Sequence, residues 1–256
     1  MDVDVLRLRE VFHLTFLREL ARSVSSSSFA LKGGSNLRFF FGSPRYSEDM
    51  DLDAVGIPVH LLRDQVMAIL ASRGLADTLR TFGIERVVGP RLSSAKQTET
   101  VQRFKVHLLT SASEDLATKV EFSRLGFDQG VRSEPIPAPF LIAYRMAPLV
   151  VPHYDEESAA SQKVKALLGR RHTEARDIFD LYILSSRLSA PSLDLQFTEA
   201  ELTLARERVL SVEYDRYRDT VVAFLAAEDQ SAYDSRAMWD EIRLRVEGLL
   251  GPGAGR

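Results

Sequence analysis

The sequence predicts an α+β protein, in which a mixed sheet with flanking helices is followed by a helical C-terminal domain. Between residues 29 and 154, short strand-like runs alternate with short helical segments. From Asp155 onward, almost only the helical spacing of apolar residues recurs. Because the two patterns call for different packing layers, we expect a division into residues 1–154 and residues 155–256.

The first domain begins with a predicted helix over roughly the first twenty residues. Leucines and phenylalanines recur there at helical spacing among Arg and Glu, and the serines of "SVSSSS" end the pattern. After a double glycine, "SNLRFFF" predicts a short helix with Ser35 as its N-cap and Gly42 at its end.

The remaining elements are predicted from the same spacing of apolar residues. The strand-like "EDMDLDAV" leads to a helix near Val59 to Arg73, and then to three β-like runs, "TLRTFGIERVV", "TVQRFKVHLLT" and "ATKVEFSRL". Past a proline-rich loop, "MAPLVVPHY" is a further short apolar segment. The expected starts of the C-terminal helices are near Asp155, Thr173, Thr198 and Ser211, and the tail "GPGAGR" is expected to fray.

The composition is that of an ordinary globular chain. Of its 256 residues 45% are hydrophobic, and the formal net charge is -3, so any contact with nucleic acid would be a local patch. The lack of cysteine excludes disulfides and thiolate metal sites and favours a cytosolic protein. The start lacks the pattern of a signal peptide, and no run reaches the roughly 20 apolar residues that span a bilayer, so we expect no membrane partner.

Asp49, Asp51 and Asp53 occupy every second position of a predicted strand and therefore share one face. A half-buried strand with its polar face in water gives the same pattern. Asp is a poor strand former, however, and neighbouring carboxylates repel unless a cation lies between them. Mg²⁺ (or Mn²⁺) takes oxygen ligands and is typically held by one or two carboxylates plus substrate phosphates. The segment therefore favours a metal site.

The double glycine before the short helix is a candidate phosphate site. It places Gly33, Gly34 and Ser35 at a helix N-terminus, where free N–H groups and the helix dipole favour an anion. Taken alone, "KGGSN" is better explained as a turn with a serine N-cap. A phosphate cradle followed by a carboxylate pair roughly fifteen residues later is a more specific combination.

Two charged positions later in the chain have both a structural and a functional interpretation. Lys163 and Arg170 lie at the two ends of one stripe along a predicted helix. The stripe is either a solvent-exposed helix surface or part of a phosphate-binding site. In "KVEF", Glu121 forms either a cross-strand salt bridge or part of an active site, where it would act as general base or as an added metal ligand.

In "ARDIFDLY", Asp177 and Asp180 lie one helical turn apart. Arg176 either braces one helix against the next or contacts phosphate directly. Asp177 would orient Lys163 or approach the metal site.

Together these segments resemble the nucleotidyltransferase superfamily and, within it, the AbiEii branch of abortive-infection and type IV toxin–antitoxin nucleotidyltransferases. "GGSNLRFF" and "PRYSEDMDLD" are similar to that branch's Gly-Gly-Thr/Ser, Leu, Arg and Arg-x-Ser-x-Asp-h-Asp pattern. "ATKVEFSR" looks like the strand that carries the third acidic residue, and "YDEESAASQKVKALLGRRHTEARDIFDLYIL" resembles the family's helical motif. The resemblance covers residues 29 to 184 in four pieces.

The resemblance implies a nucleotidyltransferase-like fold and a role for each matched residue. The implied metal ligands are Asp49, Asp51 and Glu121, while Asp53 falls outside the pair, as a supporting or surface residue. Lys163 joins these three as a catalytic residue. The implied nucleotide-binding residues are Gly33, Gly34, Ser35, Arg45, Ser47, Lys163, Arg176, Asp177 and Asp180.

The predicted function is the Mg²⁺-dependent transfer of a nucleotide from a nucleoside triphosphate to an acceptor hydroxyl, in a cleft between the two domains. The resemblance implies a toxin of a toxin–antitoxin or phage-defence system, with tRNA as the best-supported acceptor and a separately encoded antitoxin as partner. Two alternatives stay open: nucleotidylation of a protein hydroxyl, and a non-catalytic module that only binds nucleotide or a partner.

Overall fold

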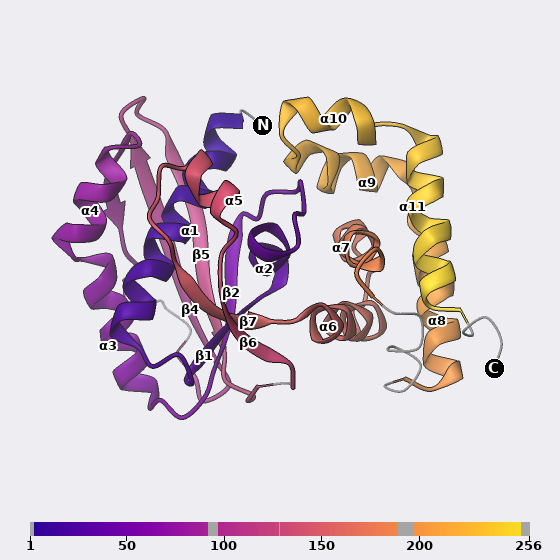
Figure 1. Cartoon of the computed structure of the whole chain (residues 1–256), viewed down its shortest axis with the longest axis horizontal. Coiled ribbons are helices and arrows are strands. Elements are labelled where there is room, and N and C mark those ends of the chain that lie inside the picture. Colours follow the sequence, from indigo (N-terminus) through magenta and orange to yellow (C-terminus); the bar gives the residue numbers. More distant parts are fainter. Residues whose placement is uncertain (1–2, 92–96, 128, 189–196, 252–256) are drawn as a thin grey trace. The chain divides into compact units, whose positions relative to one another are not determined.

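The computed structural model describes residues 3–91, 97–127, 129–188 and 197–251, which fall into two compact units (Figure 1). The sheet unit comprises Met1–Phe40 and Tyr46–Tyr154, and the helical unit comprises Phe41–Arg45 and Asp155–Arg256. From residue 252 onward, the tail that was expected to fray lies outside the described residues.

The sheet unit is built on a seven-stranded mixed sheet in the order β3-β4-β5-β2-β1-β7-β6. Its strands are β1 (Phe29–Lys32), β2 (Asp49–Ala54), β3 (Ile84–Val88), β4 (Val101–Thr110), β5 (Asp115–Ser123), β6 (Val131–Pro135) and β7 (Val150–Tyr154). The central strand β2 runs parallel to β5 and antiparallel to β1. The predicted α+β architecture with a mixed sheet is confirmed.

Helices flank this sheet, and one face carries the core. They are α1 (Val3–Ser23), α2 (Gly33–Phe40), α3 (Val59–Leu70), α4 (Arg73–Arg80) and α5 (Ala138–Ala143). α1 contacts both α3 and α4, and their apolar sides pack against alternate residues of the strands, such as Leu52, Val120 and Phe122 (Figure 1). Because strand residues alternate between faces, Asp49, Asp51 and their neighbours on β5 occupy the opposite face.

Two local predictions in this unit are wrong. Ser35 is not an N-cap, because α2 already begins at Gly33, whose φ of +68° lets the helix start directly after β1. The run "TLRTFGIERVV" is not one strand: α4 continues to Arg80, and only Ile84–Val88 are extended. The side chain of Ser72 caps α4 by accepting from the Leu75 N–H, and Leu75 and Leu79 bury one side of the helix.

The helical unit consists of α6 (Glu156–Gly169), α7 (Ala175–Ser185), α8 (Glu199–Leu210), α9 (Tyr214–Thr220), η2 (Val222–Phe224), α10 (Ala227–Tyr233) and α11 (Arg236–Leu249). Asp155 caps α6, and Thr198 caps α8 in a reciprocal capping box with Glu201. In its core, Trp239 stacks on Tyr217 with ring centroids 4.3 Å apart. No described helix is long and apolar enough to cross a membrane.

The segment 41–45 belongs to the helical unit, although the sequence division placed it with the sheet. An ion pair between two residues that are far apart in the chain explains why this segment joins the helical unit. Arg45 donates from Nη2 to Asp180 at 3.2 and 3.3 Å, and its backbone bridges Leu225.

A buried histidine in the sheet unit links α1 to the start of β2. Thr118 donates its one hydroxyl proton to the Glu48 carbonyl oxygen at 2.7 Å, and its Oγ1 lies 2.9 Å from Nε2 of His13. Nε2 must therefore be the protonated nitrogen that donates to Thr118. Burial, with repulsion from Arg9, lowers the pKa of His13 to about 3, so the ring stays neutral at physiological pH.

This lowered pKa predicts that acid destabilises the sheet unit through His13. Between pH 6.5 and pH 3 the unfolded chain binds a proton that the folded chain rejects, so the free energy of unfolding falls as the pH falls. The loss amounts to about 2 kcal/mol between pH 6.5 and pH 5. His13→Gln keeps a donor but cannot titrate. Urea unfolding between pH 7 and pH 5 should therefore show a shallower pH dependence for this variant than for the wild type, and equal slopes would contradict the assignment.

Candidate functional site

Strand pairing brings the predicted acidic residues together on the polar face of β2 and β5. In the parallel register of these strands, Asp51 is the partner of Glu121, and Asp49 is the partner of Lys119. On the other side of β2, Asp51 is the partner of Lys32. The strands thus place three carboxylates and two lysines on one small patch.

Two of the three carboxylates are already compensated by cations. Lys119 Nζ lies 3.1 Å from Asp49 Oδ2 and 3.9 Å from Glu121 Oε2. Arg103, the partner of Glu121 on β4, also donates from Nε to that carboxylate. Glu121 therefore does form the cross-strand salt bridge that its sequence context allowed.

Asp51 is different. Within the described chain its carboxylate takes part in no ion pair and no side-chain hydrogen bond, although the residue is partly buried. Burial raises the pKa of Asp51; the charge of Lys119 opposes this rise, whereas those of Glu121 and Asp49 add to it. A carboxylate that is desolvated but unpaired costs folding free energy, and it attracts a cation.

The predicted phosphate cradle lies beside this carboxylate. A Cβ added to Gly33 would come within 3.1 Å of Asp51 Oδ2, so the absence of a side chain at the start of α2 keeps the approach to Asp51 open. Two hydroxyls fix the neighbouring backbone, because Ser47 and Ser35 donate to the Asp49 carbonyl oxygen at 2.7 and 3.2 Å. Both serines, predicted to bind nucleotide, thus position the start of β2.

A methyl group at Gly33 tests this arrangement. Gly33→Ala forces alanine into a left-handed conformation, at a cost of about 1 kcal/mol, and also displaces the Asp51 carboxylate. We expect nucleotide transfer to fall at least tenfold. Gly56→Ala is the matched control, since Gly56 has a φ of +71° but open space around it. Thermal unfolding and transfer assays should show similar destabilisation in both variants but lost activity in Gly33→Ala alone; equal activities would contradict the close approach.

Asp53 has a structural role in the sheet. It is buried, pairs with Lys32 Nζ and accepts a hydrogen bond from the Tyr154 hydroxyl at 2.6 Å. The sequence placed Asp53 outside the metal pair as a supporting or surface residue, and its burial excludes the surface position. Lys32 was missed by the sequence analysis, although it directly precedes the double glycine.

The helical unit holds the second group of predicted residues in a buried charge network. Lys163 Nζ lies 2.7 Å from Asp180 Oδ2 and 3.2 Å from Asp177 Oδ1. Arg45 contacts Asp180, and Arg170 Nε lies 3.1 Å from Asp177 Oδ2. Among the described residues, these contacts join three cations to two carboxylates.

Charge pairing overcomes burial in this network. Burial alone would lower the pKa of Lys163, but Asp180 and Asp177 hold it above its usual range. Lys163 is therefore a fixed cation, oriented by Asp177 as the sequence suggested, rather than a mobile surface lysine. Arg176 is exposed and makes no ion pair within the described residues, so the bracing contact considered for it is made by Arg45 and Arg170 instead.

The predicted site residues thus form two groups, one in each unit. No set of three His, Cys, Asp or Glu side chains is arranged as a metal cluster among the described residues. The three predicted carboxylates accordingly do not converge as a ready-made three-ligand site, because Lys119 and Arg103 contact Asp49 and Glu121. Arg103 was missed by the sequence analysis, although the hairpin register of β4 and β5 could have indicated it.

Solved structures define the class of this fold. The chain is 17% identical to JHP933 from Helicobacter pylori, with a TM-score of 0.57 over 98% of this chain and 91% of that one. It is 19% identical to MenT4, a nucleotidyltransferase toxin from Mycobacterium tuberculosis H37Rv, with a TM-score of 0.61 over 99% of this chain and 87% of that one. The fold is nucleotidyltransferase-like.

The family follows from the sequence match. The model of the AbiEii toxin family, described as nucleotidyl transferases of type IV toxin–antitoxin systems, matches residues 15–252. The chain belongs to this family and is a nucleotidyltransferase toxin, which implies a nucleotide substrate and an antitoxin partner. No curated protein matches the chain significantly.

Proposed function

We propose that the protein transfers a nucleotide from a nucleoside triphosphate to a hydroxyl of an RNA acceptor, with tRNA as the acceptor class and Mg²⁺ (or Mn²⁺) as the cofactor. The observation that carries the metal-dependent transfer is Asp51, which is partly buried, makes no ion pair within the described residues and lies beside Asp49, Glu121 and the side-chain-free start of α2. The RNA acceptor is proposed from the family resemblance. A divalent cation would relieve the repulsion that this arrangement leaves uncompensated.

The residues present fit such an ion. Asp49 and Asp51 offer carboxylate oxygens on one face of β2, and Gly33 leaves space at Asp51. When bound, the ion would neutralise the triphosphate and stabilise the charge that develops during in-line displacement. Glu121 is the third ligand in the proposal. It must give up part of its contact with Arg103 to serve in that role.

The side chains around this face supply binding and proton transfer. Free backbone N–H groups at the start of α2, at Gly34 and Ser35, are suited to phosphate oxygens. The acceptor hydroxyl gives its proton to the Glu121 carboxylate oxygen that is not used as a ligand, as its own oxygen bonds to the α-phosphorus, while the bond from that phosphorus to the bridging oxygen breaks and pyrophosphate leaves. Positioning and charge neutralisation supply most of the rate.

In the same proposal, cations of the helical unit bind the phosphates. Lys163 is assigned to the β and γ phosphates, because two carboxylates hold its ammonium in place and leave a donor available. Asp177 and Asp180 orient it, and Arg45 completes the network from the segment next to Ser47. The exposed guanidinium of Arg176 is available for a direct phosphate contact.

Labelled nucleotides test the proposed acceptor. Purified chain is incubated with each labelled nucleoside triphosphate, Mg²⁺ and either total RNA or total cell protein, beside the Asp51→Asn variant. We expect label in small RNA, and none with the variant. Label in protein alone would replace RNA by a protein hydroxyl, and binding of nucleotide without any transfer would leave only a binding module.

A further inference from the structure

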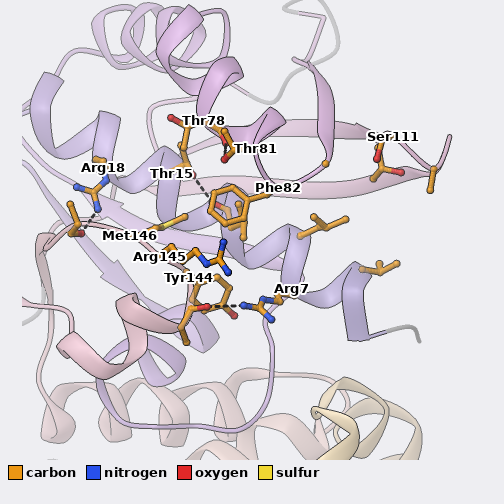
Figure 2. Close-up of a pocket in the computed structure, with 18 of the residues that line it drawn as sticks. Arg7, Thr15, Arg18, Thr78, Thr81, Phe82, Ser111, Tyr144, Arg145 and Met146 are labelled. Atoms are coloured by element: carbon orange, nitrogen blue, oxygen red, sulfur yellow. Dashed lines mark hydrogen bonds between the residues drawn. The ribbon is translucent and has the colours of Figure 1, made fainter.

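A large cavity lies in the sheet unit, away from the carboxylate face. Its volume is about 1080 Å³, and it is bordered by α1, the α4–β3 turn, the β4–β5 hairpin and the loop after α5 (Figure 2). Leu8 and Val11 of α1 contribute to its wall, which places it on the side of the sheet that α1 covers. None of the residues assigned above to nucleotide transfer lines it.

The cavity is strongly basic in a chain that is acidic overall. Four arginines line it, against one acidic residue, Glu114, within the part of the chain that the structure describes. The arginines are Arg7, Arg18, Arg22 and Arg145, of which Arg22 forms an ion pair with Glu19 at 2.8 Å. The formal net charge of the whole chain is -3, so this concentration of guanidinium groups is a local feature that would draw an anion into the cavity.

Backbone oxygens hold two of these guanidinium groups without cancelling their charge. Arg7 Nη2 donates to the Ala143 carbonyl oxygen at 2.7 Å, and Arg18 Nη1 donates to that of Pro148 at 3.2 Å. Burial and repulsion from Arg22 lower the pKa of Arg18, although Glu19 partly opposes this. A carbonyl oxygen fixes the direction of a guanidinium but leaves its net charge and its other N–H donors for a ligand.

Two turns with a positive φ border the cavity. Among the described non-glycine residues, only Ser113 and Arg145 have a positive φ, of 63° and 52°. Ser113 lies in the β4–β5 hairpin and Arg145 in the loop after α5, both of which border the cavity. Arg145 takes this conformation because it ends α5: its N–H donates to the Ile142 carbonyl oxygen, and the Met146 N–H donates to that of Leu141. This helix end fixes where the Arg145 side chain joins the lining of the cavity.

An aromatic and apolar wall completes the cavity. Phe82 and Met146 line it together with the arginines, and both are only partly buried (Figure 2). A small inorganic anion would use the guanidinium groups and leave the phenyl ring without a role. A ligand that carries both phosphate and a flat ring would use both features, since bases stack on aromatic side chains and phosphates bind arginine.

We propose that this cavity is a binding site for a phosphorylated nucleoside, separate from the nucleotide-transfer site. The phosphate is held by Arg145 and Arg7, which lie side by side at the loop after α5, with Arg18 as a further fixed cation, and the base packs on Phe82. The same chemistry is offered by a free nucleotide and by a nucleotide within an RNA strand. The site does not depend on the metal or on the acceptor proposed above.

Calorimetric titration of the full-length chain tests the site. ADP, inorganic pyrophosphate and a 5′-phosphorylated RNA trinucleotide are titrated separately in EDTA, which removes the divalent cations that the proposed transfer site needs. The variants are Arg7→Gln with Arg145→Gln, and Phe82→Leu. The control is Arg73→Gln with Arg86→Gln, which removes two exposed arginines of the same unit outside the cavity. Circular dichroism confirms that each variant is folded.

We expect the Arg7/Arg145 variant to weaken ADP or trinucleotide binding at least tenfold, because two charge-assisted contacts are lost. Phe82→Leu should weaken binding of the same ligand but not of pyrophosphate, and the Arg73/Arg86 control should stay within twofold of the wild type. If ADP loses more affinity than the trinucleotide in the arginine variant, the natural ligand is a free nucleotide. If the trinucleotide loses more, it is RNA. The proposal is overturned if the wild type binds neither, if the control loses as much affinity, or if Phe82→Leu has no effect.

Discussion

Replacing Asp51 with asparagine is expected to abolish nucleotide transfer while leaving the protein at least as stable as the wild type. The carboxylate is lost as a metal ligand, which should lower kcat by about a thousandfold, as for other electrostatic groups of a transition state. Stability behaves differently, because the charge of Asp51 is desolvated and repelled by Glu121 and Asp49. Asparagine removes that unfavourable charge and keeps the shape of the side chain.

The pH dependence of this gain has a definite sign. The pKa of Asp51 is raised in the folded chain, so its ionisation destabilises the fold at neutral pH, and the penalty disappears as the pH falls below the usual value of 3.8. The melting temperature of Asp51→Asn should therefore exceed that of the wild type at pH 7, and the difference should shrink towards pH 4.

Asp53→Asn is the matched control on the same face of the same strand. Asp53 pairs with Lys32 and Tyr154, so its neutralisation should lower stability while transfer stays within about tenfold of the wild type. If Asp51→Asn is the less stable variant, or if it retains normal turnover, the assignment of Asp51 as a metal ligand is wrong.

Replacing Asp180 with alanine is expected to be the most destabilising single change in the helical unit. The side chain is fully buried, and Arg45 and Lys163 both depend on it. Although burial would raise the pKa of Asp180, these two cations hold it below its usual range. Alanine removes the carboxylate that both buried cations share, a loss of about 3–5 kcal/mol.

Thermal unfolding of the full-length chain measures this loss. A unit of this size should melt more than about 10 °C lower for a change of that magnitude. Asp219→Ala serves as the control, because it removes an ion pair to Arg218 on the exposed surface of α9, with both side chains largely in solvent. A melting temperature for Asp180→Ala within a few degrees of this control would show that the network does not stabilise the fold.

The local sequence pattern correctly predicted those elements that depend only on their own residues. The alternation in "DMDLDA" corresponds to β2, and the cap at Asp155 corresponds to the start of α6. Two elements were mispredicted. The N-cap of α2 depended on what a single hydroxyl contacts, and the strand over "TLRTFGIERVV" was predicted from a short apolar repeat. Ser35 resembles an N-cap in sequence, but its hydroxyl donates to the carbonyl oxygen of Asp49 once Gly33 has started the helix.

The contacts that could not be predicted are those between positions far apart in the chain. Arg45 and Asp180 are separated by 135 residues, and neither belongs to a periodic pattern that points to the other. The pairing of Arg103 with Glu121 depends on the exact register of the β4–β5 hairpin, and periodicity alone leaves that register open. For the same reason, the basic cavity beside α1 has no local motif, since its walls come from four separate elements.

Binding of Mn²⁺ in the presence of a non-hydrolysable nucleoside triphosphate tests the central claim most directly. Electron paramagnetic resonance measures the free ion while the wild-type chain, or the doubly substituted Asp49→Asn and Asp51→Asn chain, is titrated with Mn²⁺. We expect one or two bound ions for the wild type and at least a hundredfold weaker binding for the double variant. If the double variant binds Mn²⁺ in the same amount and as tightly as the wild type, these two carboxylates do not hold the metal.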